Sequence, residues 1–443
     1  MKKSEFCVVV LRIHDPCILH GRGILCTLKT LRVMSDAALV LLVVVSATAC
    51  RSVPSGDFQE NDRAPQPVAD SDTPDLSADI DDVVDETADL VHSHMIRMTQ
   101  RQRIAQRFMT FVPRGFDPSV ALGPRHGDVT PTFIRRVASD TPAGFIVYPW
   151  NYDSREELIA LTGHLQSVAN VLSPGNSFLI SADQEGGRVA AFRFPDIVGV
   201  PSAADVARHG DAVFVERLAY VLGVELNAMG VNMNLAPVLD LTPIPDRSII
   251  GDRAWGNDPD EAAAFAAAYV RGMHEAGVIS TAKHFPGHGV TRVDSHGRLP
   301  IVEYRMEDLL AREIVPFQAA VDAGVPVIMT AHILFPLIDA DYPVTLSPRF
   351  VHELLREELA FDGVVISDGL EMGALRGVYD IDTTLLQALR AGVDLILLYD
   401  RYSLTDMVDR VESYVEDGSI SMAEVDRGVE RVLTLKARHG LLD

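Results

Sequence analysis

The sequence has 443 residues, 47% of them hydrophobic, and a formal net charge of −23 at pH 7. This length allows one large domain with additional segments, and the hydrophobic content is sufficient for a full core. The negative charge argues against nucleic acid or an anionic membrane surface as a partner, because both would repel the protein. All four cysteines lie in residues 1–50, so we expect neither a disulfide nor a thiolate metal site in residues 51–443.

Residues 1–50 have the pattern of an export leader. Residues 37–49 form an apolar run that is short for a membrane-spanning helix and suits the apolar part of a signal peptide. The small residues that end this run precede Cys50, which resembles a bacterial lipoprotein signal, although Ala47 stands where such signals usually have leucine. We therefore expect an exported periplasmic or cell-envelope lipoprotein, lipidated at Cys50 and touching the membrane only through that anchor. The alternatives are an uncleaved anchor and a chance apolar run.

An acidic segment follows the leader. Residues 51–90 contain twelve Asp or Glu and two Arg, a net charge of −10, together with four prolines and a single aromatic residue. Such a composition buries too little apolar area to offset the entropy lost on ordering the chain. We predict that residues 51–92 form a disordered linker and that the folded domain comprises residues 93–443.

Short apolar runs alternate with amphipathic stretches throughout residues 93–443. The predicted strands cover residues 107–112, 143–148, 178–183, 231–235, 278–283, 326–331, 363–367 and 393–398. These runs are almost continuously hydrophobic, as expected for parallel strands that are covered on both faces. Predicted helices over residues 155–171 and 258–276 lie between strands. The pattern favours an α/β fold, a (β/α)₈ TIM barrel, over a doubly wound open sheet, since no glycine-rich loop follows the first strand.

Polar residues occur where several predicted strands end. Asp183 ends one strand, Lys283 and His284 end another, and His332 and Asp368 follow two more. Unpaired charges are costly inside an apolar core. In a barrel, the C-terminal ends of the strands meet on one face, where active sites lie. These residues are therefore predicted to form one catalytic site, although an aspartate in the position of Asp368 is also a common helix cap.

The densest polar segment is KHFPGHG at residues 283–289, followed by DSH at residues 294–296. Lys283 and His284 offer hydrogen-bond donors to a sugar hydroxyl. Asp294 stands two residues before His296, so its carboxylate can orient the imidazole and raise its basicity. Three histidines in one short segment are also compatible with zinc, but the proline and glycines would separate them. We expect no metal and no organic cofactor.

Together these segments resemble the N-acetylglucosaminidase branch of the family 3 glycoside hydrolases, over roughly residues 93–443. The matching motifs, in order, are DQEGGRV at 183–189, NLAPVLD at 234–240, GDR at 251–253, KHFPGHG at 283–289 with DSH at 294–296, MTAH at 329–332 and SD at 367–368. The resemblance implies the same barrel and a retaining β-N-acetylhexosaminidase acting on peptidoglycan fragments or chito-oligosaccharides.

The resemblance also implies residue roles. Asp368 matches the nucleophile that forms a covalent glycosyl-enzyme, and His296, held by Asp294, matches an acid/base on a mobile loop. The residues that match sugar-binding positions are Asp183, Arg253, Lys283 and His284. A histidine suits the acid/base role because its ordinary pKa of about 6.5 lies near neutrality.

The loop motif separates branches of the family. Family 3 β-glucosidases usually take a carboxylate acid/base from a second α/β domain, whereas this chain has the histidine loop and ends at Asp443. We therefore expect a single catalytic domain without the second α/β domain, acting as a monomer on a glycan. Three positions depart from the family pattern: Ala191, Val290 and Gly369. Arg193 is a candidate replacement for the arginine that the family often has at position 191.

Three other functions remain open from the sequence. The same fold serves β-glucosidases and β-xylosidases, which differ in the donor sugar. A histidine acid/base also leaves room for phosphate as acceptor, as in a phosphorylase. A cell-surface lipoprotein that only binds glycan is the third alternative, and the intact Asp368 and Asp294–His296 pair argue against it.

Overall fold

The computed structural model describes residues 30–31, 42–43, 76–113, 140–243 and 248–443. The chain divides into two compact units, Met1–Thr73 and Pro74–Asp443. In the first unit, the described residues form one antiparallel pair, β1 (Thr30–Leu31) and β2 (Leu42–Val43). The predicted lipidation site Cys50 and the first part of the predicted linker, residues 51–75, lie outside the described residues.

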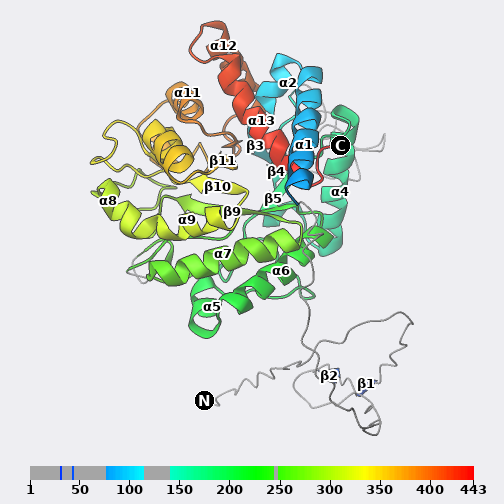
Figure 1. Cartoon of the computed structure of the whole chain (residues 1–443), viewed down its shortest axis with the longest axis vertical. Helices are drawn as coiled ribbons and strands as arrows, with labels where there is room; N and C mark the ends of the chain where they lie inside the picture. Colours follow the sequence, from blue (N-terminus) through cyan, green and yellow to red (C-terminus); the bar gives the residue numbers. More distant parts are fainter. Residues whose placement is uncertain (1–29, 32–41, 44–75, 114–139, 244–247) are drawn as a thin grey trace, which may run out of the picture. The chain divides into compact units, whose positions relative to one another are not determined.

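The second unit is built around a sheet of eight parallel strands (Figure 1). The strands are β3 (Phe108–Phe111), β4 (Gly144–Ile146), β5 (Leu179–Ala182), β8 (Met233–Asn234), β9 (Ile279–Phe285), β10 (Val327–Thr330), β11 (Val364–Ser367) and β12 (Ile396–Leu397). Their order is β11-β10-β9-β8-β5-β4-β3-β12, and a parallel bridge between Ile366 and Leu395 brings the two edges together. The sheet is therefore a nearly closed barrel, and the predicted TIM-barrel fold is confirmed.

Every predicted strand range overlaps one strand of this barrel. β5, β10 and β11 are buried along their whole length, which explains why their sequences do not alternate between polar and apolar residues. β9 extends to Phe285, two residues past its predicted end, so that Lys283 and His284 lie within the strand. A two-stranded ribbon, β6 (Gln184–Gly186) and β7 (Val189–Ala190), follows β5.

Helices cover the outside of the barrel (Figure 1). The longer ones are α4 (Arg155–Leu172), α6 (Ala212–Ala228), α7 (Pro259–Glu275), α9 (Val315–Asp322), α11 (Ile381–Ala391), α12 (Leu404–Glu416) and α13 (Met422–Arg438). The shorter helices are α2 (Gln100–Ala105), α5 (Ala203–His209), α8 (Met306–Asp308) and α10 (Gly373–Arg376). Single turns of 3₁₀ helix lie at Pro149–Asn151, Gly251–Arg253 and Val344–Leu346. Two π-helical segments lie at Leu309–Glu313 and Arg349–Glu358.

The two predicted helices correspond to α4 and α7 within a residue at each end. The Ser154 side chain accepts a hydrogen bond from the backbone N–H of Glu157 at the start of α4. At the start of α7, the Asp258 carboxylate accepts from the N–H groups of Asp260 and Glu261. These caps satisfy amide groups that the helix itself leaves without partners.

The predicted linker differs from the structure over its second half. Residues Leu76–Arg97 form a helix, α1, that packs along α13 (Figure 1). Val91 is buried in the main core, and the Nε2 atom of His94 is 2.8 Å from the backbone oxygen of Asp443. The second compact unit, Pro74–Asp443, therefore includes this helix, part of which was predicted to be linker. The acidic composition concealed an apolar face that supports the helix through tertiary packing.

Helix α13 closes the N-terminal end of the barrel. Its residues Val432 and Leu435 pack in the same cluster as the strand side chains that point into the barrel. The neighbouring Lys436 is fully buried, and its ammonium group donates hydrogen bonds to Asn176 and Gln106 side-chain oxygens at 2.7 and 3.2 Å. Burial lowers the pKa of Lys436 to about 7. None of the helices in the described part of the chain has the length and apolarity that a membrane span requires.

Candidate active site

The polar residues that follow the barrel strands meet at the C-terminal end of the barrel. Asp183 follows β5 and Asp368 follows β11. Lys283 and His284 lie near the end of β9, and the Lys283 ammonium nitrogen is 2.6 Å from a carboxylate oxygen of Asp183. The parallel strands therefore bring these predicted site residues to one face, as in other barrels of this architecture.

Asp368 is held ionised by its surroundings. Its carboxylate accepts a hydrogen bond of 2.7 Å from the backbone N–H of Gly369. Burial alone would raise the pKa of Asp368, but the nearby His332, His284 and His296, together with the Gly369 N–H, hold it below its ordinary value. An ionised carboxylate at the mouth of the barrel is suited to act as a nucleophile.

His332 fixes the backbone beside Asp368. β10 and β11 pair in register up to Thr330 and Ser367, which places His332 beside the residue after Asp368. The Nε2–H of His332 donates to the carbonyl oxygen of Gly369 at 3.0 Å, and its Nδ1 lies 2.8 Å from the Thr345 hydroxyl. Because a carbonyl oxygen can only accept, Nε2 of His332 carries a proton, and burial lowers the pKa of the ring. This residue is therefore structural support for the site.

Asp294 and His296 form the predicted pair. An Asp294 carboxylate oxygen accepts from the backbone N–H of His296 at 2.9 Å and lies 2.7 Å from its Nδ1 atom. Both side chains are exposed, His296 by 73% and Asp294 by 57%. Burial acts to raise the pKa of Asp294, but the hydrogen bonds from His296 hold it below its ordinary value. The carboxylate thus fixes the proton on Nδ1 and leaves Nε2 directed elsewhere for proton transfer.

The loop that carries this pair is attached to the loop that follows Asp368. The N–H of Gly373 donates to the carbonyl oxygen of His296 at 3.0 Å, and the N–H of Ala374 donates to that of Ser295 at 2.9 Å. A Cβ atom on Gly373 would lie 2.5 Å from the His296 carbonyl oxygen. The Ser295 hydroxyl is also 3.0 Å from Nε2 of His288. The sequence pattern did not reveal the role of Gly373, which depends on contact between two distant loops.

A charged network connects the end of β9 to the segment that follows β5. Lys283 contacts both Asp183 and Glu185, at 2.6 and 2.7 Å, and Arg253 binds Glu185 with two hydrogen bonds of 2.7 Å. Burial would raise the pKa of Glu185, but Lys283 and Arg253 lower it to about 2. Of these four side chains Asp183 is the most exposed, at 34%. Glu185 was not among the predicted site residues, although it belongs to the DQEGGRV motif.

A second buried carboxylate, Asp240, organises the KHFPGHG segment. It accepts hydrogen bonds from the backbone N–H of His288 at 2.6 Å and lies 2.7 Å from Nδ1 of His284. Burial would raise the pKa of Asp240, but His284 and His288 lower it to about 2. Burial lowers the pKa of His288 to about 4, and its ring nitrogens lie 2.7 Å from the Thr291 hydroxyl and 3.0 Å from that of Ser295.

The hydrogen bonds of these histidines can be compared with what a zinc site would need. The ring nitrogens of His288 and the Nδ1 atoms of His284 and His296 are already engaged in separate hydrogen bonds. Across the described residues, no group of three or more histidine, cysteine, aspartate or glutamate side chains is arranged to hold a metal ion.

Comparisons with known proteins identify the family of the chain. The family described as "Glycosyl hydrolase family 3 N terminal domain" matches residues 134–435. The chain belongs to this family. It is a glycoside hydrolase.

Individual relatives extend the comparison. A β-hexosaminidase of Stenotrophomonas maltophilia is 36% identical over 291 residues, which are 64% of this chain and 83% of the relative. A family 3 β-N-acetylglucosaminidase from Paenibacillus superposes with a TM-score of 0.71 and 36% identity, covering 78% of this chain and 63% of that protein. A β-N-acetylhexosaminidase from Beutenbergia cavernae superposes with a TM-score of 0.68 and 27% identity, covering 77% of this chain and 99% of that protein.

One departure of this family 3 hydrolase from the common motif has a direct structural reason. Gly369 stands where an aspartate often follows the nucleophile, and a Cβ atom there would lie 2.0 Å from the ring of Tyr399. Tyr399 follows β12, and its ring centre is 6.2 Å from that of Tyr148, which follows β4. The ring of Tyr399 therefore occupies the space that an aspartate side chain at position 369 would need.

The departure at Ala191 has a different outcome. The backbone oxygen of Ala191 accepts a hydrogen bond of 2.9 Å from the Tyr152 hydroxyl. Arg193, the candidate replacement, donates from one guanidinium nitrogen to the backbone oxygens of Gly187 and Arg188, both at 3.0 Å. In this hydrolase Arg193 therefore stabilises the β6–β7 ribbon.

The Gly373 contact predicts a change in catalysis that is independent of sugar binding. Gly373→Ala should displace the Asp294–His296 loop, because its methyl group would overlap the His296 carbonyl oxygen. A displacement of about 1 Å costs up to roughly 10²-fold in rate, so we expect kcat to fall while KM changes little. The loss should be greatest for substrates with poor leaving groups.

The matched control is Gly163→Ala in α4, where a Cβ atom would meet nothing within 4 Å. Both variants should unfold at the temperature of the parent chain. Unchanged kcat in Gly373→Ala on a poor leaving group would show that the loop contact has no role in turnover.

Proposed function

We propose that the chain is a retaining exo-β-N-acetylhexosaminidase that removes terminal β-linked N-acetylglucosamine from peptidoglycan fragments or chito-oligosaccharides. The hydrogen-bonded Asp294–His296 pair, on a loop attached to the one that follows Asp368, is the observation that carries the proposal. This pair supplies proton transfer, and Asp368 supplies a carboxylate that the surrounding groups keep ionised.

In the first step of the proposed mechanism, a carboxylate oxygen of Asp368 attacks the anomeric carbon of the terminal sugar. The bond from that carbon to the glycosidic oxygen breaks, and His296 gives its Nε2 proton to the leaving oxygen. The product is a glycosyl ester of Asp368 and a free acceptor hydroxyl. Asp294 stabilises the positive charge of the ring before its proton leaves.

In the second step, the now neutral His296 takes a proton from water. The water oxygen attacks the anomeric carbon from the face that the first acceptor left, and Asp368 is released as a carboxylate. Two inversions leave the product with the original β configuration. A neutral base is favourable here because it places no second full negative charge beside Asp368.

The proposal assigns sugar binding to Asp183, Arg253, Lys283 and His284. Asp183, the most exposed of the ion-paired carboxylates, is suited to accept a hydrogen bond from a sugar hydroxyl. Lys283 and Arg253 are largely occupied by Glu185, so they position the floor of the site and offer their remaining N–H groups. Nε2 of His284 is left available because Asp240 binds Nδ1.

A panel of aryl β-glycosides tests the donor sugar. We expect turnover of the N-acetylglucosaminide and little turnover of the glucoside or xyloside, with a β-configured product in the first minutes of reaction by NMR. Activity on the glucoside alone would replace the proposal with the β-glucosidase function. A rate that requires phosphate and yields a sugar 1-phosphate would replace it with the phosphorylase function. If no glycoside is turned over, non-catalytic glycan binding would be the remaining function.

The acceptor side of the substrate is tested separately. The predicted export leader would place the enzyme in the cell envelope, near peptidoglycan fragments. We therefore expect muropeptides to be hydrolysed with a higher kcat/KM than chitobiose. The reverse ranking would assign the enzyme to chito-oligosaccharides.

A further inference from the structure

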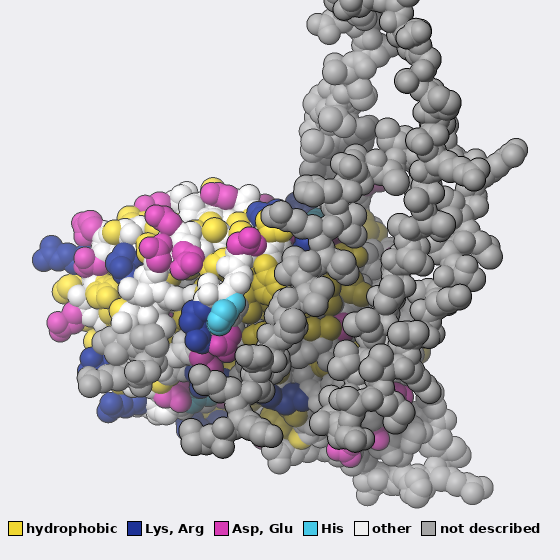
Figure 2. Space-filling view, turned by 90° about the horizontal axis from the view of Figure 1, so that it is seen from below, with side chains coloured by type: hydrophobic (Ala, Val, Ile, Leu, Met, Phe, Trp, Pro, Cys, Tyr) yellow, Lys and Arg dark blue, Asp and Glu magenta, His cyan; other side chains and the backbone are white. Residues whose placement is uncertain are grey.

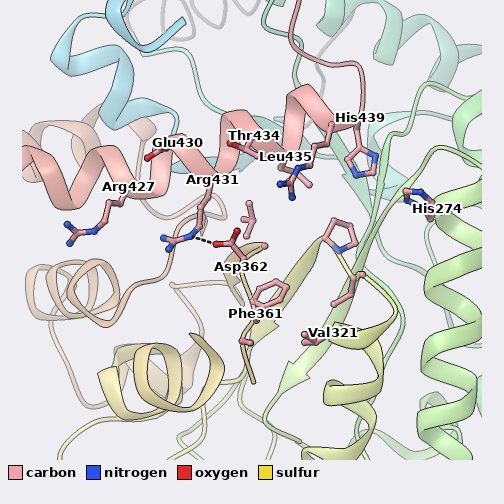
Figure 3. Close-up of a pocket in the computed structure, with 17 residues that line it drawn as sticks. His274, Val321, Phe361, Asp362, Arg427, Glu430, Arg431, Thr434, Leu435 and His439 are labelled. Atoms are coloured by element: carbon pink, nitrogen blue, oxygen red, sulfur yellow. Dashed lines mark ion pairs between the residues drawn. The ribbon is translucent and has the colours of Figure 1, made fainter. Parts of the chain in front are cut away.

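Two cavities lie at the N-terminal end of the barrel, opposite the site of Asp368. The larger has a volume of 560 Å³ and lies between α13 and the loops that lead into β10 and β11. Figure 3 shows Arg427 and Arg431 extending from α13 on the same side, with Asp362 facing Arg431. The smaller cavity, of 220 Å³, shares Arg427 and Arg431 with the larger one.

The smaller cavity has an excess of positive charge. Its cationic residues are Arg107, Arg356, Arg390, Arg427 and Arg431, and its carboxylates are Asp394 and Glu424. Five guanidinium groups against two carboxylates is unexpected in a chain whose net charge is −23. On the face drawn in Figure 2, by contrast, acidic and basic side chains are interspersed wherever the described surface is visible. The cavity is therefore a local concentration of arginines.

Both carboxylates already have hydrogen-bond donors. Asp394 is 2% exposed and is shared by Arg356 and Arg431, and it also accepts a hydrogen bond from the backbone N–H of Val365 at 2.8 Å. Glu424 accepts from the backbone N–H and the hydroxyl of Ser421 at the start of α13. Among the residues that line this cavity, the five guanidinium groups therefore outnumber the carboxylates.

The guanidinium group of Arg107 is hydrogen-bonded to backbone carbonyl groups. Arg107 is 2% exposed, and its guanidinium donates to backbone carbonyl oxygens, among them those of Asp394 at 2.6 Å and Val425 at 2.9 Å. Carbonyl groups satisfy its N–H donors but carry no net charge. Burial, together with repulsion from Arg431 and Arg427, lowers the pKa of Arg107 to about 10 despite the attraction of Asp394 and Asp426. An anion in the cavity would relieve this repulsion.

We propose that this arginine cluster binds a phosphate group, either free or as a small phosphate ester. Planar guanidinium groups bind phosphate through paired N–H donors. One water takes about 30 Å³ of liquid volume, so the smaller cavity has room for a phosphate group with several waters. The ester's organic part would extend past Arg427 and Arg431 into the larger cavity, whose wall includes Phe361 and Pro326. This site is separate from the proposed hydrolase function.

Thermal unfolding of the full chain in inorganic phosphate tests the proposal. Sodium chloride at matched ionic strength is the reference, because screening alone also changes stability. We expect a saturable rise of about 2–4 °C in the unfolding midpoint. Arg427→Gln should raise the phosphate concentration needed for half of that rise by roughly tenfold, the loss expected for one charge-assisted hydrogen bond. A second series uses glycerol 3-phosphate in place of inorganic phosphate. Tighter binding of glycerol 3-phosphate would indicate a phosphate ester as the ligand, and tighter binding of inorganic phosphate would indicate free phosphate.

The matched control is Arg217→Gln, an exposed arginine of α6 on another part of the barrel. It should leave the phosphate response unchanged, and neither variant should alter turnover of the aryl N-acetylglucosaminide. An equal response in Arg427→Gln and the parent chain would overturn the proposal, as would a rise no larger than that in chloride. A response that saturating N-acetylglucosamine removes would place the phosphate at the catalytic site and would overturn it as well.

Discussion

Asp368→Ala is expected to lower kcat on an aryl β-N-acetylglucosaminide by at least about 10⁴-fold. The substitution removes the atom that bonds to the anomeric carbon, while the hydrogen bonds of the Asp183–Lys283–Glu185 network remain. Binding should therefore persist, and the KM or the inhibition constant of N-acetylglucosamine should change much less than kcat. Steady-state rates together with inhibitor binding measure the two effects separately.

Rescue of the variant by azide tests whether Asp368 acts as the nucleophile. In Asp368→Ala, azide has room to attack the anomeric carbon while the aryloxide leaves, and a single displacement inverts the configuration. The expected product is an α-glycosyl azide and a partly restored rate. Asp400→Ala is the matched control, since Asp400 is an exposed aspartate that lines the cleft beside His296. A comparable loss in Asp400→Ala, or a β-glycosyl azide from Asp368→Ala, would remove Asp368 from the nucleophile role.

The barrel was predictable because its sequence pattern is local. Strands covered on both faces are short and almost wholly apolar, and the polar residue that follows such a run marks its C-terminal end. That reasoning located β5 with Asp183 and β11 with Asp368. The acidic composition of residues 51–92 was less informative, because α1 begins at Leu76 and packs against α13.

The pairing of charges was less predictable than their positions. Arg253 and Lys283 match sugar-binding positions in the sequence, but the sequence did not indicate that each also contacts the buried Glu185. Such pairing depends on which side chains face each other across the barrel, which motif order alone does not specify. Lys436 is a second example, because its position on α13 gives no indication that its ammonium group is buried against Asn176. Charged residues inside the barrel therefore need the three-dimensional structure for their interpretation.

The loop that carries Asp294 and His296 was also predictable only in part. The spacing of Asp294 and His296 predicts their hydrogen bond, which the structure contains. The attachment of that loop to Gly373 and Ala374 joins segments that are far apart in sequence. This contact ties the largely exposed segment that carries His296 to the segment that follows Asp368, which would help to position the proposed acid/base accurately.

His296→Ala is expected to lower kcat/KM by about 10²–10⁴-fold for substrates with poor leaving groups. The effect should be small for a 4-nitrophenyl glycoside, because that leaving group departs without a proton. A plot of log(kcat/KM) against the pKa of the leaving group should therefore become steeper in the variant. Azide should accelerate release of the glycosyl-enzyme and give a β-glycosyl azide, because Asp368 still performs the first displacement.

Two further variants separate proton transfer from simple damage to the loop. His209→Ala removes an exposed histidine of α5 and should leave the plot unchanged. Asp294→Asn keeps the imidazole but replaces the carboxylate that accepts from Nδ1, so its slope should lie between those of the parent chain and His296→Ala. Equal losses on good and poor leaving groups would show that His296 positions the substrate and does not transfer the proton. Because the Asp–His pair distinguishes this branch from family members with a carboxylate acid/base, that result would also remove the main support for the proposed function.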